Sequence, residues 1–80
     1  MSQNNLIPLH LLPCGEKGKI KKLTCTGTLK RRMMDLGLIR DTIIHSLRKS
    51  PSGDPTAYEI RGSVIALRAE DAAKILIEML

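Results

Sequence analysis

The chain has 80 residues and a net charge of +5, 42% of its residues are hydrophobic, and Tyr58 is its one aromatic residue. A chain of this length can bury a single core, so we expect one domain over residues 1–80 and exclude two. The apolar fraction excludes a disordered chain, and the scarcity of rings argues against a protein that stacks single-stranded bases.

The first expected element is a strand. Residues 1–7 are expected to be flexible and to precede it. From Gly18 to Leu23, lysines alternate with a glycine and an isoleucine, and such alternation is typical of a strand with one buried face. The lysines of this strand are expected to face water.

A short helix is expected next. Leu29, Met33 and Leu36 are four and three positions apart, which places their side chains on one face of a helix. Thr28 is expected to cap its N-terminus. Gly37 is expected to end it, because glycine adopts the left-handed conformation past a helix end without steric cost.

Three further strands and a loop follow the helix. Short runs rich in β-branched or alternating apolar residues are typical of strands, and they cover Thr42 to Lys49, Thr56 to Arg61 and Ser63 to Leu67. Gly62 predicts a tight hairpin between the last two strands. We expect an exposed loop from Ser50 to Pro55, because two prolines and a glycine cannot supply a regular ladder of backbone donors.

The C-terminal segment is expected to form a helical turn and a closing strand. Glu70 to Lys74 favours the turn, and Ile75 to Leu80 places Ile75, Ile77 and Met79 on alternate positions of a strand. Five short strands with one inserted helix predict a mainly β fold, a small and partly open barrel.

No residue set predicts catalysis, so we expect no enzyme and no cofactor. The sequence shows no nucleophile with a recognisable base and no framed pair of carboxylates. His10, Cys14, Cys25 and His45 lack the close pairs that nucleate a zinc site. Separate thiols and a surface histidine are the favoured interpretation, and a module that binds iron or zinc as a sensor stays an alternative.

The positive charge is concentrated in one part of the chain. Residues 17–49 contain ten of the thirteen Lys and Arg residues and two acidic residues. Such a surface attracts an acidic partner, a nucleic acid or an anionic membrane face. On the expected helix, Lys30, Arg31 and Arg32 lie opposite the apolar face with Met34 beside them. This is a solvated face or a docking surface, since Arg and Met are enriched at interface cores.

The sequence also bears on location. No stretch approaches the roughly 20 apolar residues of a membrane-spanning helix, and the N-terminal segment lacks the basic and apolar regions of a secretory signal. We therefore expect a cytoplasmic protein without membrane insertion, whose cysteines stay as thiols.

Three motifs in chain order resemble those of the ferrous iron transport protein A (FeoA) family. The matching runs are Arg31 to Leu38 (RRMMDLGL, the family's RRLxxLGL), Ser50 to Pro55 (SPSGDP, its PxGDP loop) and Arg61 to Arg68 (RGSVIALR, its RGxxxALR). The structural residues of these motifs are Gly37, Leu38, Pro51, Pro55 and Gly62. The resemblance covers nearly the whole chain. It departs at Asp41, where the family usually has glycine, and aspartate tolerates a left-handed turn.

The resemblance implies an SH3-like five-stranded barrel that is accessory or regulatory in ferrous iron uptake. Its implied partner is a membrane ferrous iron transporter with a cytoplasmic GTPase domain. The residues expected to contact this partner are Lys30, Arg31, Arg32, Met34, Gly53 and Asp54. No nucleic acid partner is expected, although a basic nucleic-acid-binding barrel stays an alternative, and a weak homodimer through an open barrel edge stays possible.

Overall fold

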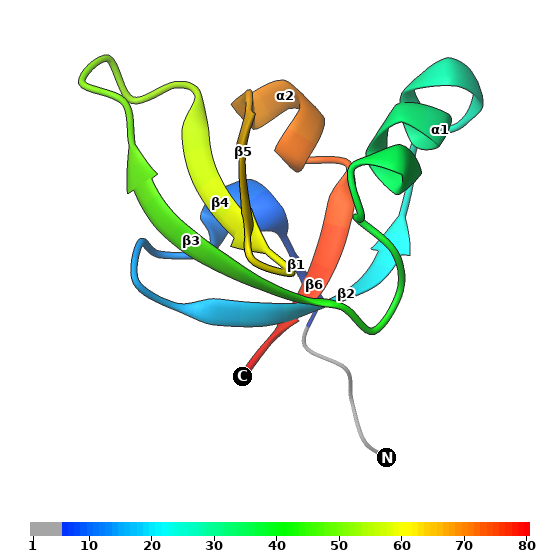
Figure 1. Ribbon diagram of the computed structural model, residues 1–80, viewed down its shortest axis with the longest axis horizontal. Coiled ribbons are helices and arrows are strands. Elements are labelled where there is room, and N and C mark those ends of the chain that lie inside the picture. The colour runs from blue at the N-terminus through cyan, green and yellow to red at the C-terminus, as the bar shows by residue number, and fades with distance from the viewer. Residues whose placement is uncertain (1–5) are drawn as a thin grey trace.

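The computed structural model describes residues 6–80, which form six strands, one 3-10 turn and two short helices (Figure 1). In chain order the elements are β1 (Leu6–Pro8), η1 (Leu9–Leu11), β2 (Lys17–Leu23), α1 (Gly27–Asp35), β3 (Ile43–Lys49), β4 (Thr56–Ile60), β5 (Ser63–Leu67), α2 (Ala69–Ala72) and β6 (Ile75–Met79). The strands form one antiparallel sheet in the order β1-β6-β2-β3-β4-β5. In Figure 1 the sheet curves around an interior, and α1 lies beside the end of β2. The prediction of a mainly β fold with an inserted helix is confirmed.

The five predicted strands are present, and the structure contains a sixth, so the predicted number of strands is wrong by one. The additional strand, β1, pairs with β6, where Leu6 faces Glu78 and Ile7 faces Ile77. Leu6 and Ile7, which were expected to be flexible, therefore lie in a strand. The rest of the segment expected to be flexible, residues 1–5, lies outside the described residues.

The core is built from apolar side chains of nearly every element. Its fully or almost fully buried members are Leu9, Leu12, Ile20, Cys25, Met33, Leu38, Ile44, Tyr58, Ile60, Leu67, Ala72, Ile75 and Ile77. Alternation along β2 and β6 explains why Ile20, Ile75 and Ile77 are among them, because every second residue of a strand faces the same side. Gly18 also faces inward, and a Cβ at this position would lie 2.6 Å from Ile77 Cδ1. A side chain there would displace the one on β6.

The two ends of α1 differ in how closely they follow the sequence-based expectation. The N-cap is Thr26, and its side chain makes no capping hydrogen bond. The assignment of the cap to Thr28 is therefore wrong. Gly27, at a φ of +66°, turns the chain into the helix before Thr28 is reached.

Gly37 ends α1 as predicted, at a φ of +97°. The Gly37 N–H donates to the Met34 carbonyl at 3.0 Å and the Leu38 N–H donates to the Met33 carbonyl at 2.9 Å, the pair of bonds that defines a Schellman motif. Leu36, expected on the apolar face, is 44% exposed, whereas Leu38 is fully buried. Leu38, in the turn after the helix, therefore packs in the core in place of Leu36.

The predicted turns are also present. Arg61 and Gly62, both at positive φ, form the two-residue connection between β4 and β5, as expected for a tight hairpin. Asp41 adopts a φ of +69°, so the aspartate does take the left-handed conformation. Within the loop from residue 50 to 55, the Ser50 N–H donates to the Pro55 carbonyl at 3.0 Å. The turn α2 and the closing strand β6 confirm the interpretation of the C-terminal segment.

Candidate partner-binding site

The basic residues of α1 lie on its solvent-exposed side. Lys30, Arg31 and Arg32 are exposed, and Met34 is 48% exposed even though it is a large apolar side chain. The adjacent Met33 is fully buried in the core. The helix therefore turns one methionine inward and presents the other near Lys30 and Arg31 on its exposed side.

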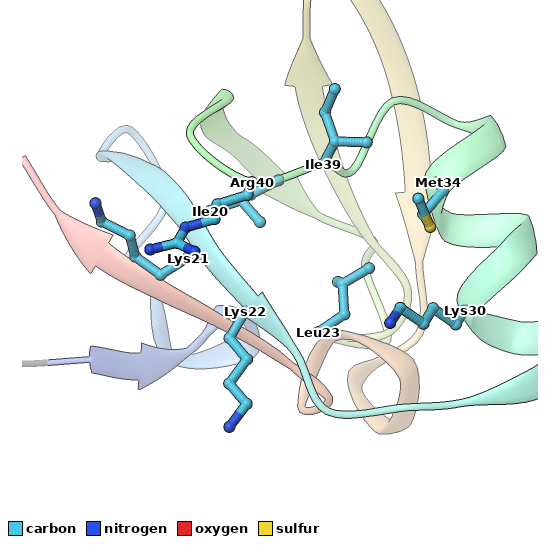
Figure 2. Close-up of a pocket in the computed structure, with 8 residues that line it drawn as sticks. All are labelled: Ile20, Lys21, Lys22, Leu23, Lys30, Met34, Ile39 and Arg40. Carbon is cyan, nitrogen blue, oxygen red and sulfur yellow. The ribbon is translucent and has the colours of Figure 1, made fainter.

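A groove borders this face of α1, and we call it the α1–β2 groove. Its volume is about 350 Å³, and it is lined by Ile20, Lys21, Lys22, Leu23, Lys30, Met34, Ile39 and Arg40. Figure 2 shows Leu23 on β2, Ile39 on the segment after the helix, and Met34 on α1 around the same space. The lining thus combines apolar side chains from three segments with four cationic ones.

The groove opens where β2 separates from the chain that leads into β3. The register of β2 with β3 runs from Lys17 to Lys19. One further contact follows at Ile20, whose N–H donates to the Thr42 carbonyl at 2.9 Å and whose carbonyl accepts the Asp41 N–H at 2.6 Å. Beyond this point the two segments diverge, and α1 lies between them. The left-handed turn at Asp41 therefore sets one wall of the groove.

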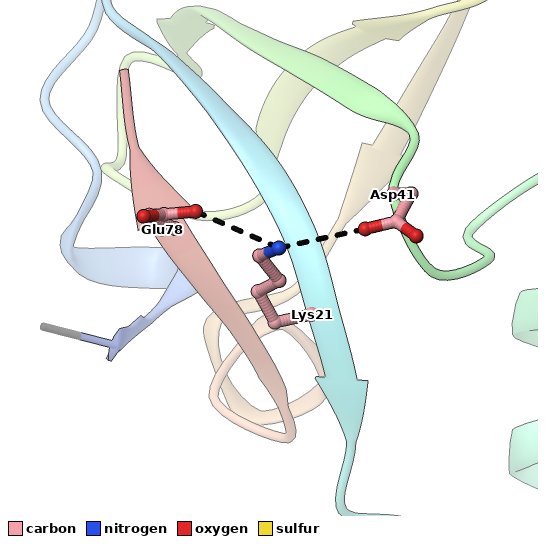
Figure 3. Close-up of polar contacts among 3 residues, drawn as sticks. All are labelled: Lys21, Asp41 and Glu78. Atoms are coloured by element: carbon pink, nitrogen blue, oxygen red, sulfur yellow. Dashed lines mark hydrogen bonds and ion pairs between the residues drawn. The ribbon is translucent and has the colours of Figure 1, made fainter. Parts of the chain in front are cut away.

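The four cations around the groove are not equivalent. The Lys21 ammonium lies 3.5 Å from Asp41 Oδ1 and 3.6 Å from Glu78 Oε1, as Figure 3 shows. Its charge is balanced, and it links β2 to the Asp41 turn and to β6. Lys22, Lys30 and Arg40 have no ion-pair partner among residues 6–80. These three cations leave the groove with a net positive potential.

A second hollow continues along the helix. It has a volume of about 400 Å³ and is lined by Gly27, Lys30, Arg31, Met34 and Asp35. Lys30 and Met34 line both hollows. Lys30 and Met34 therefore lie between two concave surfaces, one lined by four cations and the other by two cations and Asp35.

The structure separates the two groups of residues that were expected to contact a partner. The loop with Gly53 and Asp54 connects β3 to β4 and lies at the opposite end of the molecule from α1 (Figure 1). The Asp54 carboxylate accepts a hydrogen bond from the Ala69 N–H at 2.8 Å. This contact binds the loop to the first residue of α2, so Asp54 has a role in the fold.

The His and Cys side chains that the alternative of a metal sensor would use do not form a cluster in the described residues. Within the described part of the chain, no three His, Cys, Asp and Glu side chains are arranged to hold a metal ion. Cys14 is exposed and Cys25 is buried, and both are free thiols. Cys25 Sγ lies 3.6 Å from Met33 Sδ inside the core. His45 Nδ1 lies 3.7 Å from Glu59 Oε1 on neighbouring strands.

Sequence reasoning missed six of the eight residues that line the groove, namely Ile20, Lys21, Lys22, Leu23, Ile39 and Arg40. Leu23 ends the basic strand and Arg40 precedes the Asp41 turn. Their proximity to α1 depends on the path of the chain rather than on a local pattern. The available signal was the aspartate that replaces the family's usual glycine, since a left-handed residue at that position brings the segment after α1 back to β2.

Neither helix in the described residues has the length and apolar character that a membrane span requires.

Comparison with known proteins finds relatives of this chain that are described as iron transport proteins. A curated protein of Porphyromonas gingivalis, described as an Fe(2+) transport protein A/Fe(2+) transporter FeoB fusion protein, is 31% identical over 72 residues, which are 90% of this chain. The chain spans only 8% of the length of that relative.

Solved structures show the same fold. A FeoA-like protein from Clostridium acetobutylicum is 34% identical with a TM-score of 0.86, covering 100% of this chain and 91% of the other. The zinc complex of FeoA from Stenotrophomonas maltophilia, described as an SH3 domain protein, is 20% identical with a TM-score of 0.79 over 88% of this chain and 87% of the other. These likenesses confirm the SH3-like fold. The family described as "FeoA domain" matches residues 7–79, and the chain belongs to that family.

Proposed function

We propose that this chain is a non-enzymatic accessory or regulatory protein of ferrous iron uptake that binds the cytoplasmic GTPase-bearing region of a membrane ferrous iron transporter. Membership of the FeoA family links the chain to ferrous iron transport. In the Porphyromonas gingivalis relative, the printed name joins an Fe(2+) transport protein A to an Fe(2+) transporter in one polypeptide. Two proteins that are joined in one organism commonly associate in others, and a cytoplasmic location follows from such a partner.

The observation that carries the proposal is the exposed side of α1. Lys30, Arg31 and a half-exposed Met34 lie on the exposed side of α1 and line two hollows beside it, and Arg32 is exposed further around the helix. A large apolar side chain kept in water beside arginines is typical of a protein interface, where Arg and Met are enriched. We therefore assign the partner contact first to Lys30, Arg31, Arg32 and Met34. Gly53 and Asp54 stay a second, separate prediction.

The experiment is a titration of the purified chain against the cytoplasmic GTPase-bearing region of its cognate transporter. Reversal of two charges, Arg31→Glu with Arg32→Glu, is expected to weaken binding by about tenfold or more, because the interface would then juxtapose like charges. The folded state is expected to persist, since both side chains are exposed. The same variant is expected to impair ferrous iron uptake by cells.

A matched control has the same charge change elsewhere. Arg61→Glu with Arg68→Glu alters two exposed arginines that flank β5 and line neither of the two hollows beside α1. Equal weakening by both double variants would show a general charge effect and contradict the assignment to α1. Saturable binding to RNA, lost steeply as salt rises, together with no binding to the transporter region, would favour the nucleic-acid alternative instead.

A further inference from the structure

We infer that the α1–β2 groove binds an acidic segment of a partner protein that inserts an apolar side chain between α1 and β2. This inference rests on the proposed function for the identity of the partner, and adds the site on this chain and the chemistry of the segment that occupies it. It follows from the shape of the groove, its apolar lining and the charges around it.

The apolar part of the groove can hold an inserted side chain. Leu23, Met34 and Ile39 face a shared space of about 350 Å³, and each of them belongs to a different segment. This volume is at the lower end of the range for binding pockets, about 300 to 1,000 Å³. It suits a short anchor of one or two side chains rather than a whole domain surface. Met34 can adjust to the shape of the anchor, because its side chain is unbranched and flexible.

The charges around the groove determine which segment can enter it. Lys22, Lys30 and Arg40 lack ion-pair partners among the described residues, whereas Lys21 is already paired with Asp41 and Glu78. Carboxylates beside the inserted side chain would balance these three cations. A basic segment would place like charges together, which disfavours binding. The complementary occupant is therefore an acidic segment with an apolar anchor.

The arrangement also separates attraction from anchoring. The three cations are exposed or lie at the rim, so they act over a distance of about a Debye length and raise the association rate. The apolar side chains line the groove, and their contact with an inserted side chain excludes water after docking, which slows dissociation. Variants of the rim cations should therefore change the association rate, and variants of the apolar lining should change the dissociation rate. A diffuse basic surface would not show this difference.

The first arm of the test uses overlapping peptides that cover the cytoplasmic region of the cognate transporter. Nuclear magnetic resonance of the labelled chain would record which peptides shift the backbone amides of Leu23, Lys30 and Ile39. The binding peptides are expected to contain several carboxylates around a Leu, Ile, Phe or Met residue. Binding confined to neutral or basic peptides would overturn the inference.

The second arm uses variants of exposed residues. Lys22→Glu with Arg40→Glu is expected to weaken the binding of the transporter region by about tenfold, mainly through slower association and with loss of its salt dependence. Met34→Ser is expected to weaken binding mainly through faster dissociation. The matched control for the charge change is Lys49→Glu with Arg48→Glu, two exposed cations at the end of β3. Equal effects of both charge reversals would overturn the inference.

The third arm separates this inference from the proposed function. The probe is a synthetic glutamate-rich peptide with two leucines, compared with one whose leucines are serines and one whose glutamates are glutamines. If the transporter region does not bind but the first peptide binds in the groove, the proposed function fails and the groove assignment holds. If the transporter region binds but neither groove variant affects it, the groove assignment fails alone. The groove assignment would also be overturned if RNA competed with the peptide, or if this chain formed a dimer that Arg40→Glu abolished.

Discussion

Gly37 is the residue at which backbone conformation most directly shapes the candidate site. It lies between α1 and the segment that carries Ile39 and Arg40, and its φ is +97°. A Cβ built on it would have no atom within 4 Å. The position therefore requires glycine for its backbone conformation, not for lack of space.

Gly37→Val is expected to lower the free energy of unfolding by about 1 kcal/mol or more, because a β-branched residue is strained at positive φ. Gly37→Asn is expected to cost less, since asparagine tolerates the left-handed conformation. Urea unfolding followed by circular dichroism measures both values. Equal losses for the two variants, or none for valine, would contradict the assigned origin of the cost.

The charge of Lys21 is balanced within the protein, so it is not evidence for a partner. This residue belongs to a basic run that the sequence presents as one surface, yet its ammonium lies between two carboxylates from different segments. Partly exposed pairs of this kind contribute up to about 1 kcal/mol each. A count of lysines and arginines therefore overstates the positive charge available to a partner, and the structure reduces it to the cations without partners.

Among the elements, α2 shows how a short helix depends on distant residues. It has four residues, too few to be stable alone. Ala72 lies in the core, and the Ala69 N–H at the start of the helix donates to the Asp54 carboxylate. The loop between β3 and β4 thus supplies the cap that the preceding residue, Arg68, does not provide.

The loss of this cap can be measured. Asp54→Ala is expected to lower the free energy of unfolding by about 1 kcal/mol, the usual effect of removing an N-terminal cap. Asp54→Asn keeps a side-chain oxygen that can accept the hydrogen bond and is expected to cost less. Hydrogen exchange at the Ala69 amide would increase in the alanine variant. Unchanged exchange there would contradict the capping role.

The same pair of variants tests the loop as a second contact for the transporter. If the Asp54 carboxylate binds the partner directly, Asp54→Asn should weaken binding as much as Asp54→Ala does, despite its smaller effect on stability. If only the alanine variant affects binding, the effect follows from the fold.

Elements with local signals could be predicted from the sequence. The spacing of Leu29 and Met33 predicted α1, and Gly37 and Gly62 predicted the turns that the structure contains. Strand β1 could not be predicted, because three residues that include a proline carry no periodicity. It exists through its pairing with β6, more than sixty positions later in the chain.

The candidate site also has one part that the sequence predicted and one part that it did not. The exposed face with Arg31, Arg32 and Met34 follows from helical periodicity and was predicted. The groove was not, because Leu23 and Ile39 come together only when β2, α1 and the Asp41 turn are placed in space. The contact between Asp54 and Ala69 spans fifteen positions and was equally invisible. Sequence patterns identified the helix face, and the tertiary structure supplied the space beside it.

For the whole molecule, stability depends on an almost entirely aliphatic core around a single phenol. Tyr58 is 1% exposed and lies on β4, where it pairs with Ser46 of β3 and Ile65 of β5. Burial raises the pKa of Tyr58 above its ordinary value, and the hydroxyl of Thr56 opposes this effect in part. The electrostatic effects of Cys14 and Asp54 act in the same direction as burial.

This raised pKa makes the stability of the protein sensitive to alkaline pH. Above about pH 10 the unfolded chain loses its phenol proton while the folded chain retains it, so the unfolded state is favoured progressively as pH rises. Below that pH the contribution of Tyr58 to stability is fully present.

The free energy of unfolding should therefore decrease above about pH 10, and it should decrease less in Tyr58→Phe, which has no proton to lose. Every other ionisable group is common to the two proteins, so the difference between the two curves isolates the phenol. Because Tyr58 is the single tyrosine, phenolate absorbance gives an independent titration. Identical alkaline decreases in the two proteins, with a phenolate transition at the ordinary pH, would show that Tyr58 is not held neutral by the core.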